Sequence, residues 1–109
     1  LKVAGKKFTH GIGTHAHSEI TYDLNGKGYR RFYSMVGHND GGQDTYLTFE
    51  VHVDDKKVFD SGDMKKGEKA KPVDISVKGA NTLKLVVTNG QDGKPEGDHA
   101  DWGYAFLVK

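Results

Sequence analysis

The sequence predicts an all-β fold, an antiparallel β-sandwich of the jelly-roll type. Apolar and polar residues alternate with a period of two in several short runs, so each run has one apolar and one polar face. Turn residues separate these runs, and the 109 residues include 15 glycines and only two prolines. No stretch has a convincing helical period. Strands with one face in water are typical of antiparallel sheets that pack face to face.

The alternation is clearest in LTFEVHV, where Leu47, Phe49, Val51 and Val53 point one way. The same criterion, applied along the chain, predicts six strands: EITYDL at 19–24, YRRFYSMV at 29–36, LTFEVHV at 47–53, PVDISV at 72–77, TLKLVV at 82–87 and GYAFLV at 103–108. Turn signals lie between them: NGKG at 25–28, NDGGQD at 39–44, VDDKK at 53–57, KGAN at 78–81 and NGQDGKPEGD at 89–98.

Length and composition narrow the class of protein. A chain of 109 residues has room for one core, so we expect a single module over residues 1–109. The net charge of +1 gives no reason to expect a nucleic-acid partner, and the absence of a long apolar run gives none to expect a membrane partner. There is no cysteine, which excludes disulfides and thiolate metal sites. The chain begins inside an apparent strand without a signal peptide, as expected of a fragment of a larger protein.

The stretch HGIGTHAHSEI, residues 10–20, concentrates histidines and glycines. If the segment is extended, His15 and His17 project to the same face and could share a metal ion with His99 from the distant DHAD. This alternative is a metal-dependent, cupin-like enzyme, but Glu19 follows His17 too closely for the cupin pattern. Gly11 and Gly13 favour an unusual backbone or the close approach of another strand.

The second informative stretch is GDHADWGYAF at residues 97–106. Trp102, the single tryptophan, either caps the core or offers a flat apolar plate to a sugar ring. Asp98, His99 and Asp101 beside it can hydrogen-bond to sugar hydroxyls. No pair of carboxylates is recognisably placed for glycoside hydrolysis, so we expect no catalysis.

Acidic turns could also hold a structural calcium ion, which takes carboxylate and carbonyl oxygens. NDGGQD provides Asp40 and Asp44 as candidate ligands.

Four segments together resemble the NPCBM family, carbohydrate-binding module family 51: FTHGIGTHAHSEITYDLNGKGYRRFYSMVG, LTFEVHVDDKKVFDSGDM, PVDISVKGANTLKLVVTNGQDG and DHADWGYAFLV. The resemblance implies a lectin-like β-sandwich, without catalysis, covalently linked to the catalytic domain of a glycoside hydrolase. It also implies a protein that is secreted or on the bacterial cell surface, with galactose-containing or blood-group-type glycans as ligands. His15 and the stretch Asp98 to Trp102 become the candidate glycan contacts. Because the family usually begins earlier, we expect this chain to lack the family's N-terminal strands.

Overall fold

A computed structural model describes residues 2–3, 6–7, 11–15, 18–25, 27–38, 46–65, 67–88 and 99–109. All strand pairs among them are antiparallel. The strands are β1 Lys2–Val3, β2 Lys6–Lys7, β3 Gly11–His15, β4 Ser18–Asp23, β5 Arg31–His38, β6 Tyr46–Val53, β7 Lys56–Asp60, β8 Met64–Lys65, β9 Lys71–Ser76, β10 Thr82–Thr88 and β11 His99–Val108. None of the described residues forms a helix that could cross a membrane.

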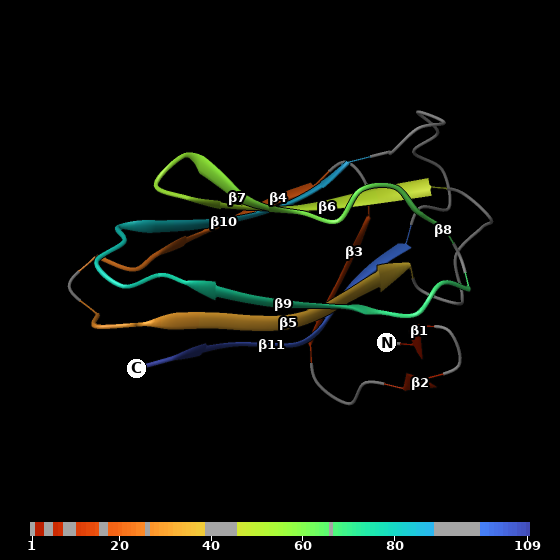
Figure 1. Ribbon diagram of the computed structural model, residues 1–109, viewed down its shortest axis with the longest axis horizontal. Helices are drawn as coiled ribbons and strands as arrows, with labels where there is room; N and C mark the ends of the chain where they lie inside the picture. The colour runs from red at the N-terminus through yellow and green to blue at the C-terminus, as the bar shows by residue number, and fades with distance from the viewer. Residues whose placement is uncertain are drawn as a thin grey trace.

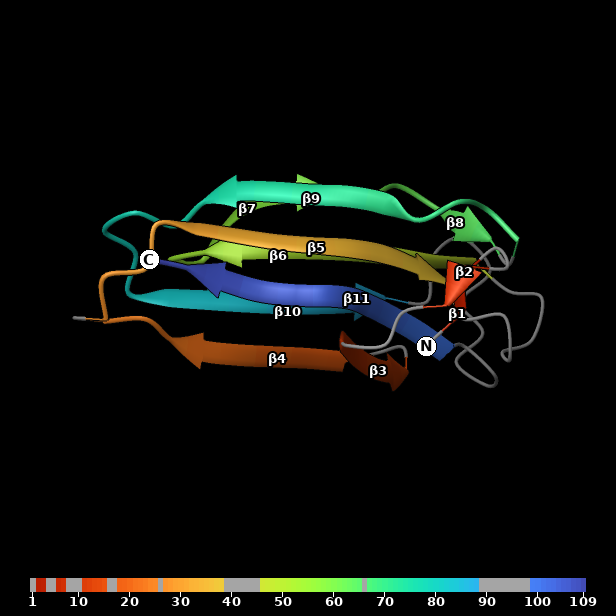
Figure 2. The same ribbon diagram turned by 90° about the horizontal axis from the view of Figure 1, so that it is seen from below.

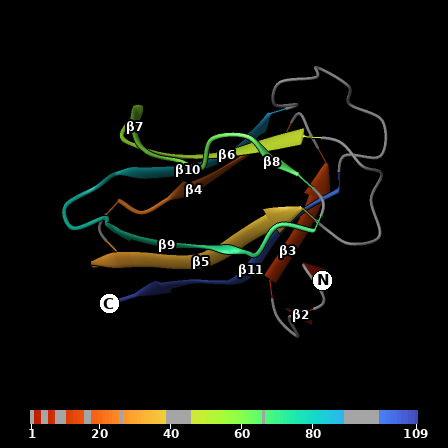
Figure 3. The same ribbon diagram turned by 45° about the vertical axis from the view of Figure 1, so that its right-hand side comes forward.

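Two sheets pack face to face and form the predicted sandwich (Figure 1, Figure 2). The order β3-β11-β5-β9 makes one sheet, called here the β11 sheet. The order β4-β10-β6-β7 makes the other, the β10 sheet, with β8 paired to β6. The chain passes repeatedly from one sheet to the other, and Figure 3 shows β3 rising from the lower layer towards the upper one. This crossing pattern is that of a jelly roll and confirms the predicted fold class.

All six predicted strands are present, with boundaries shifted by a few residues. The largest difference is at the last strand, because β11 begins at His99 rather than Gly103. The stretch GIGTH, where Gly11 and Gly13 suggested either an unusual backbone or the close approach of another strand, is the strand β3 and pairs with β11. The strand β7, KKVFD, was missed because four of its five residues are exposed, which leaves no apolar alternation to detect.

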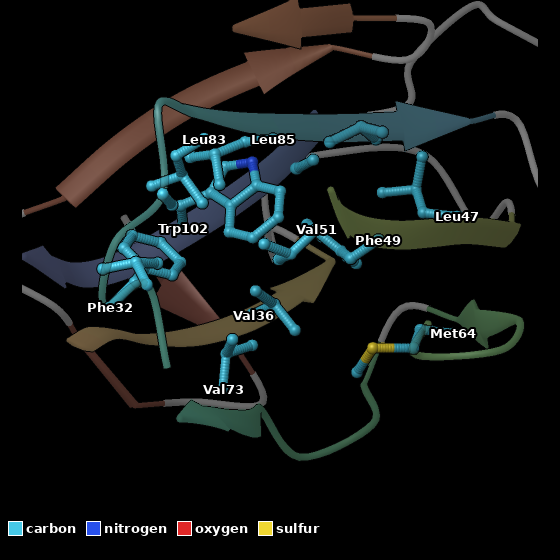
Figure 4. Close-up of a cluster of buried hydrophobic side chains, with 14 of the residues drawn as sticks. Phe32, Val36, Leu47, Phe49, Val51, Met64, Val73, Leu83, Leu85 and Trp102 are labelled. Atoms are coloured by element: carbon cyan, nitrogen blue, oxygen red, sulfur yellow. The ribbon is translucent and has the colours of Figure 1, made fainter. Parts of the chain in front are cut away.

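The core lies between the two sheets and contains the residues that the alternation placed inward (Figure 4). Leu47, Phe49 and Val51 of β6 are fully buried, as predicted. The core's centre is Trp102 of β11, whose ring meets that of Phe49 edge to face at a centroid distance of 5.3 Å. The ring of Phe32, from β5, also lies near Trp102, at a centroid distance of 6.5 Å.

The turn between β6 and β7 confirms the signal VDDKK. Asp54 and Asp55 both have positive φ, 50° and 67°, as the central residues of a type I′ hairpin require. The Asp54 carboxylate also accepts hydrogen bonds from the backbone N–H groups of Asn81 and Thr82, at 2.8 and 3.0 Å. One side chain therefore links this hairpin to the loop that leads into β10.

A β-bulge divides β11 into two halves. Gly103 is opposite Met35 and Phe106 is opposite Tyr33, so β11 has one more residue than β5 in this interval. Inside the bulge Tyr104 has φ +48°, a left-handed conformation that is unfavourable for a bulky residue. The Ser34 hydroxyl donates a 3.1 Å hydrogen bond to the Gly103 carbonyl at the bulge, and this bond is buried.

Candidate functional site

The two histidine-bearing segments that looked distant in sequence are neighbouring strands. The register of β11 with β3 places His99 directly opposite His15. On its other side, β11 pairs with β5, which places Ala100 opposite His38. The sequence prediction that THAH and DHAD come together is confirmed for the described residues. The end of the β11 sheet that carries His15, His38 and His99 is called here the histidine end.

The register also settles which positions share a face of the sheet. Side chains of directly opposed residues in an antiparallel pair point to the same side, and successive residues alternate. Ala100 and Trp102 belong to the core. Asp101 is therefore on the outward face, together with positions 99 and 15.

Asp101 is only 1% exposed although it faces away from the core. Its opposite positions are Gly13 on β3 and Gly37 on β5, neither of which has a side chain beyond Cα. The short pair β1–β2 lies on the outward side of the β11 sheet at this end (Figure 1, Figure 2). Glycines on both sides of Asp101 leave room for other groups to come close to the sheet at this point.

A buried carboxylate is costly unless polar groups stabilise it, and Asp101 is among the residues that interact with another group of the protein. Asp101 thus places a buried carboxyl group at the histidine end, and its role as a glycan contact stays a prediction. The glycine frame around it was missed as part of the site. The sequence signal for Gly13 was the stretch GIG, and Gly37 had no signal of its own.

The prediction that Trp102 offers a plate to a sugar ring is wrong. Its side chain is 0% exposed and its ring packs against Phe49 between the sheets (Figure 4). Successive residues of a strand point to opposite faces, so Asp101 points outward and Trp102 points inward. The polar residues next to Trp102 in the sequence therefore do not surround its side chain. The alternative interpretation of Trp102, as a core residue, is the one the structure bears out.

Several predicted residues lie outside the described part of the chain. They are His17, Asp98 and the two candidate calcium ligands, Asp40 and Asp44. Calcium binding by Asp40 and Asp44 stays a prediction. A metal ion shared by His15 and His17 also depends on a residue outside the described ranges; β3 ends at His15, and β4 begins at Ser18 in the other sheet. Within the described ranges there is no group of three side chains able to hold a metal ion.

A β-sandwich with candidate polar residues at one end of a sheet fits the class of binding modules. The chain belongs to the NPCBM/NEW2 domain family, which it matches over residues 1–108. It is a non-catalytic carbohydrate-binding module of this family. The family resemblance read from the sequence is thereby confirmed, and the cupin-like alternative is not supported.

Three relatives indicate the setting of such modules. The CBM51 module of a Clostridium perfringens GH95 protein, solved in complex with methyl-galactose, is 43% identical with a TM-score of 0.89, and the match covers 99% of this chain and 78% of that one. A structure of the M60 catalytic domain of Clostridium perfringens ZmpB with its CBM51-1 and CBM51-2 domains is 37% identical with a TM-score of 0.88, over 94% of this chain and 11% of that one.

The third relative is the alpha-1,3-galactosidase B of Akkermansia muciniphila, 33% identical over 105 residues. The match covers 94% of this chain but only 13% of that protein. The chain therefore spans a small part of the length of this relative and of ZmpB.

Proposed function

We propose that this module binds galactose-containing glycans at the histidine end and thereby targets a secreted bacterial glycoside hydrolase to its substrate. The observation that carries the proposal is the register of β3 and β11, which places His99 directly opposite His15 on the outward face. His38 lies at the same end of the sheet, at a position that shares the inward face with Ala100. Asp101 adds a buried acceptor on the same face as positions 15 and 99. Imidazole rings and carboxylates are polar groups that can donate to or accept from sugar hydroxyls.

Galactose is the preferred sugar because the module solved with methyl-galactose is 43% identical to this chain. A second CBM51 module, from Clostridium perfringens ZmpB, was solved in complex with GlcNAc and is 30% identical. N-acetylglucosamine is therefore the second candidate. Both sugars present several hydroxyls to a polar site, so a direct comparison is needed to rank them.

The role in targeting rests on the relatives, whose modules are parts of much longer proteins. A galactosidase and a protein with a catalytic M60 domain both contain a segment similar to this chain. A module that holds a glycan raises the local concentration of substrate for a catalytic domain on the same polypeptide, even when its own affinity is weak. Because glycan-bearing surfaces lie outside cells, we expect the whole protein to be secreted.

Titration calorimetry of the 109-residue module with methyl-galactose and with N-acetylglucosamine tests the proposal. We expect galactose to bind more tightly. His99→Ala should weaken its binding about tenfold or more, because it removes a hydrogen-bonding ring from the site. His52→Ala is the matched control: His52 lies on β6 of the other sheet, 2.9 Å from Glu50, and should leave affinity unchanged.

Failure to bind either sugar would contradict the proposed function. An equal loss of affinity in His99→Ala and His52→Ala would contradict the proposed site. His99→Ala has to be compared with the parent by melting temperature, since a general loss of folding would lower the apparent affinity of any module.

A further inference from the structure

A groove lies on the outward face of the β11 sheet, formed by the second half of β11 with β5 and β9. Its volume is about 460 Å³, which is in the range of sites that hold small ligands. The described residues that form its walls and floor come from three strands: Tyr33, Ser34 and Met35 of β5, Pro72, Val73 and Asp74 of β9, and Tyr104 and Phe106 of β11.

Aromatic rings dominate this groove. Phe106 is 52% exposed and its ring centroid lies 5.4 Å from that of Tyr33. Tyr104 is 36% exposed and adds a third ring to the groove, from the same strand as Phe106. Large apolar residues that stay in water on a rigid sheet carry a free-energy cost, so contiguous ones indicate a binding surface.

Polar groups border the rings on one side. The Asp74 carboxylate accepts hydrogen bonds at 2.7 Å from the Arg31 guanidinium, and about half of each side chain is exposed. The hydrogen bond to Asp74 is the main reason that the pKa of Arg31 is raised, and the Tyr33 hydroxyl contributes as well. Arg31 therefore adds a guanidinium beside Asp74, which with Tyr33 and Phe106 lines the groove.

The backbone at the groove is strained at Tyr104. A tyrosine at φ +48° is less favourable than glycine there, because its Cβ crowds the adjoining backbone. Strained residues that persist in a native structure occur most often at functional sites. Glycine would relieve the strain at this position, but it would leave the groove without the aromatic side chain of Tyr104.

We propose that this groove is a second glycan-contact site, separate from the histidine end, where a pyranose ring lays its apolar face on Phe106. Its hydroxyls hydrogen-bond to Asp74 and Arg31 at the rim. An exposed ring with an adjacent, ion-paired carboxylate and guanidinium suits a ligand that has an apolar face and a polar edge. This site rests on the proposed function of the module as a glycan binder. The ligand is a galactose-terminated oligosaccharide, and the two sites bind it independently.

The test uses ¹H–¹⁵N NMR titrations of the module with a galactose-terminated tetrasaccharide and with methyl-galactose. We expect two sets of shifted amides, one at the histidine end and one on residues 103–107 with Tyr33 and Asp74. Phe106→Ala should remove the second set and weaken tetrasaccharide binding there about tenfold or more, as loss of an aromatic stacking partner does. Val58→Ala is the control, because Val58 is an exposed apolar residue on β7 of the other sheet.

Tyr104→Gly gives a measurement that a merely structural role would not reproduce. Glycine accepts φ +48° freely, so the melting temperature should stay close to that of the parent while groove affinity falls. Amide shifts confined to the histidine end, with tetrasaccharide affinity unchanged in Phe106→Ala and Tyr104→Gly, would overturn the second site and leave the proposed function intact. No shift anywhere would overturn both. If Phe106→Ala instead dissolves a dimer seen by light scattering, the groove is a contact between copies and the glycan site is wrong.

Discussion

Trp102 lies at the middle of β11, inside the sandwich, while its sequence neighbours are polar. Trp102→Ala would leave a cavity the size of an indole ring between the two sheets, beside Phe49 and Phe32. We expect a loss of about 3–5 kcal/mol in the free energy of unfolding and a fall in melting temperature of about 10 °C or more. Thermal unfolding followed by circular dichroism measures it.

Trp102→Phe is the informative companion. The indole N–H has no hydrogen-bond partner among the described residues, so phenylalanine removes an unpaired buried donor along with part of the ring. The loss of unfolding free energy in Trp102→Phe should be well under half of the loss in Trp102→Ala. Sugar affinity below the melting temperature should be kept in both variants. A loss of affinity with unchanged stability would contradict the core assignment.

Asp60 carries a pH dependence that can be worked out in sign. Its pKa is lowered, first by the hydrogen bond from the Gly62 backbone N–H and then by Lys57. The unfolded chain therefore binds this proton more readily than the folded one. The carboxylate stabilises the fold above its ordinary pKa of about 4, and this contribution is lost as the pH falls through the lower folded value.

Melting curves of the parent and of Asp60→Ala should accordingly differ at pH 7 and converge towards pH 2. The Lys57 ion pair, at 3.0 Å, is exposed, so the difference should also shrink in high salt. A difference that grew on acidification would contradict the sign.

At the scale of the element, the β6–β7 hairpin contrasts two neighbouring aspartates of similar backbone conformation. Asp54→Ala removes the acceptor for two backbone N–H groups and leaves a Cβ at positive φ, so a loss of about 1–3 kcal/mol is expected. Asp55→Gly relieves its left-handed conformation at an exposed position and should be neutral or stabilising by less than about 1 kcal/mol. Urea unfolding of both variants distinguishes them, and a larger loss for Asp55→Gly would be the contrary result.

The elements also explain what the sequence could predict. Alternation identifies which residues of β6 and β10 point inward, because burial of one face imposes a period of two along any single strand. It does not say which strands share a sheet, and β3 illustrates the limit. GIGTH has no apolar alternation, and its strand exists because β11 pairs with it.

The candidate site was partly predictable for the same reason. His15, His99 and Asp101 were chosen for their chemistry, and the register brings their positions together. Trp102 was misassigned because its burial depends on Phe32 and Phe49, which are contributed by strands far away in the sequence. The groove beside Phe106 depends on the β-bulge in β11, and no local sequence pattern predicted that bulge.

For the whole molecule, topology should limit the rate of folding. Apart from the β1–β2 and β6–β7 pairs, the strand pairs of the two sheets join segments that other strands separate in the sequence. Such non-local pairing requires long loops to close before contacts form, which is typical of β-sandwiches that fold in milliseconds to seconds. Stopped-flow refolding from urea should therefore give a time constant of about a millisecond or longer, and a microsecond phase that accounts for the whole amplitude would contradict it.

The strand β11 runs the length of the sandwich, from His99 at the histidine end to Val108 near the opposite end (Figure 1). Ten extended residues cover roughly 30 Å, at about 3.3 Å each. In a longer polypeptide that continued past Lys109, whatever came next would start that far from a sugar held at the histidine end. With a sugar at the proposed site, this length would act as a spacer between the bound sugar and the next segment of the polypeptide.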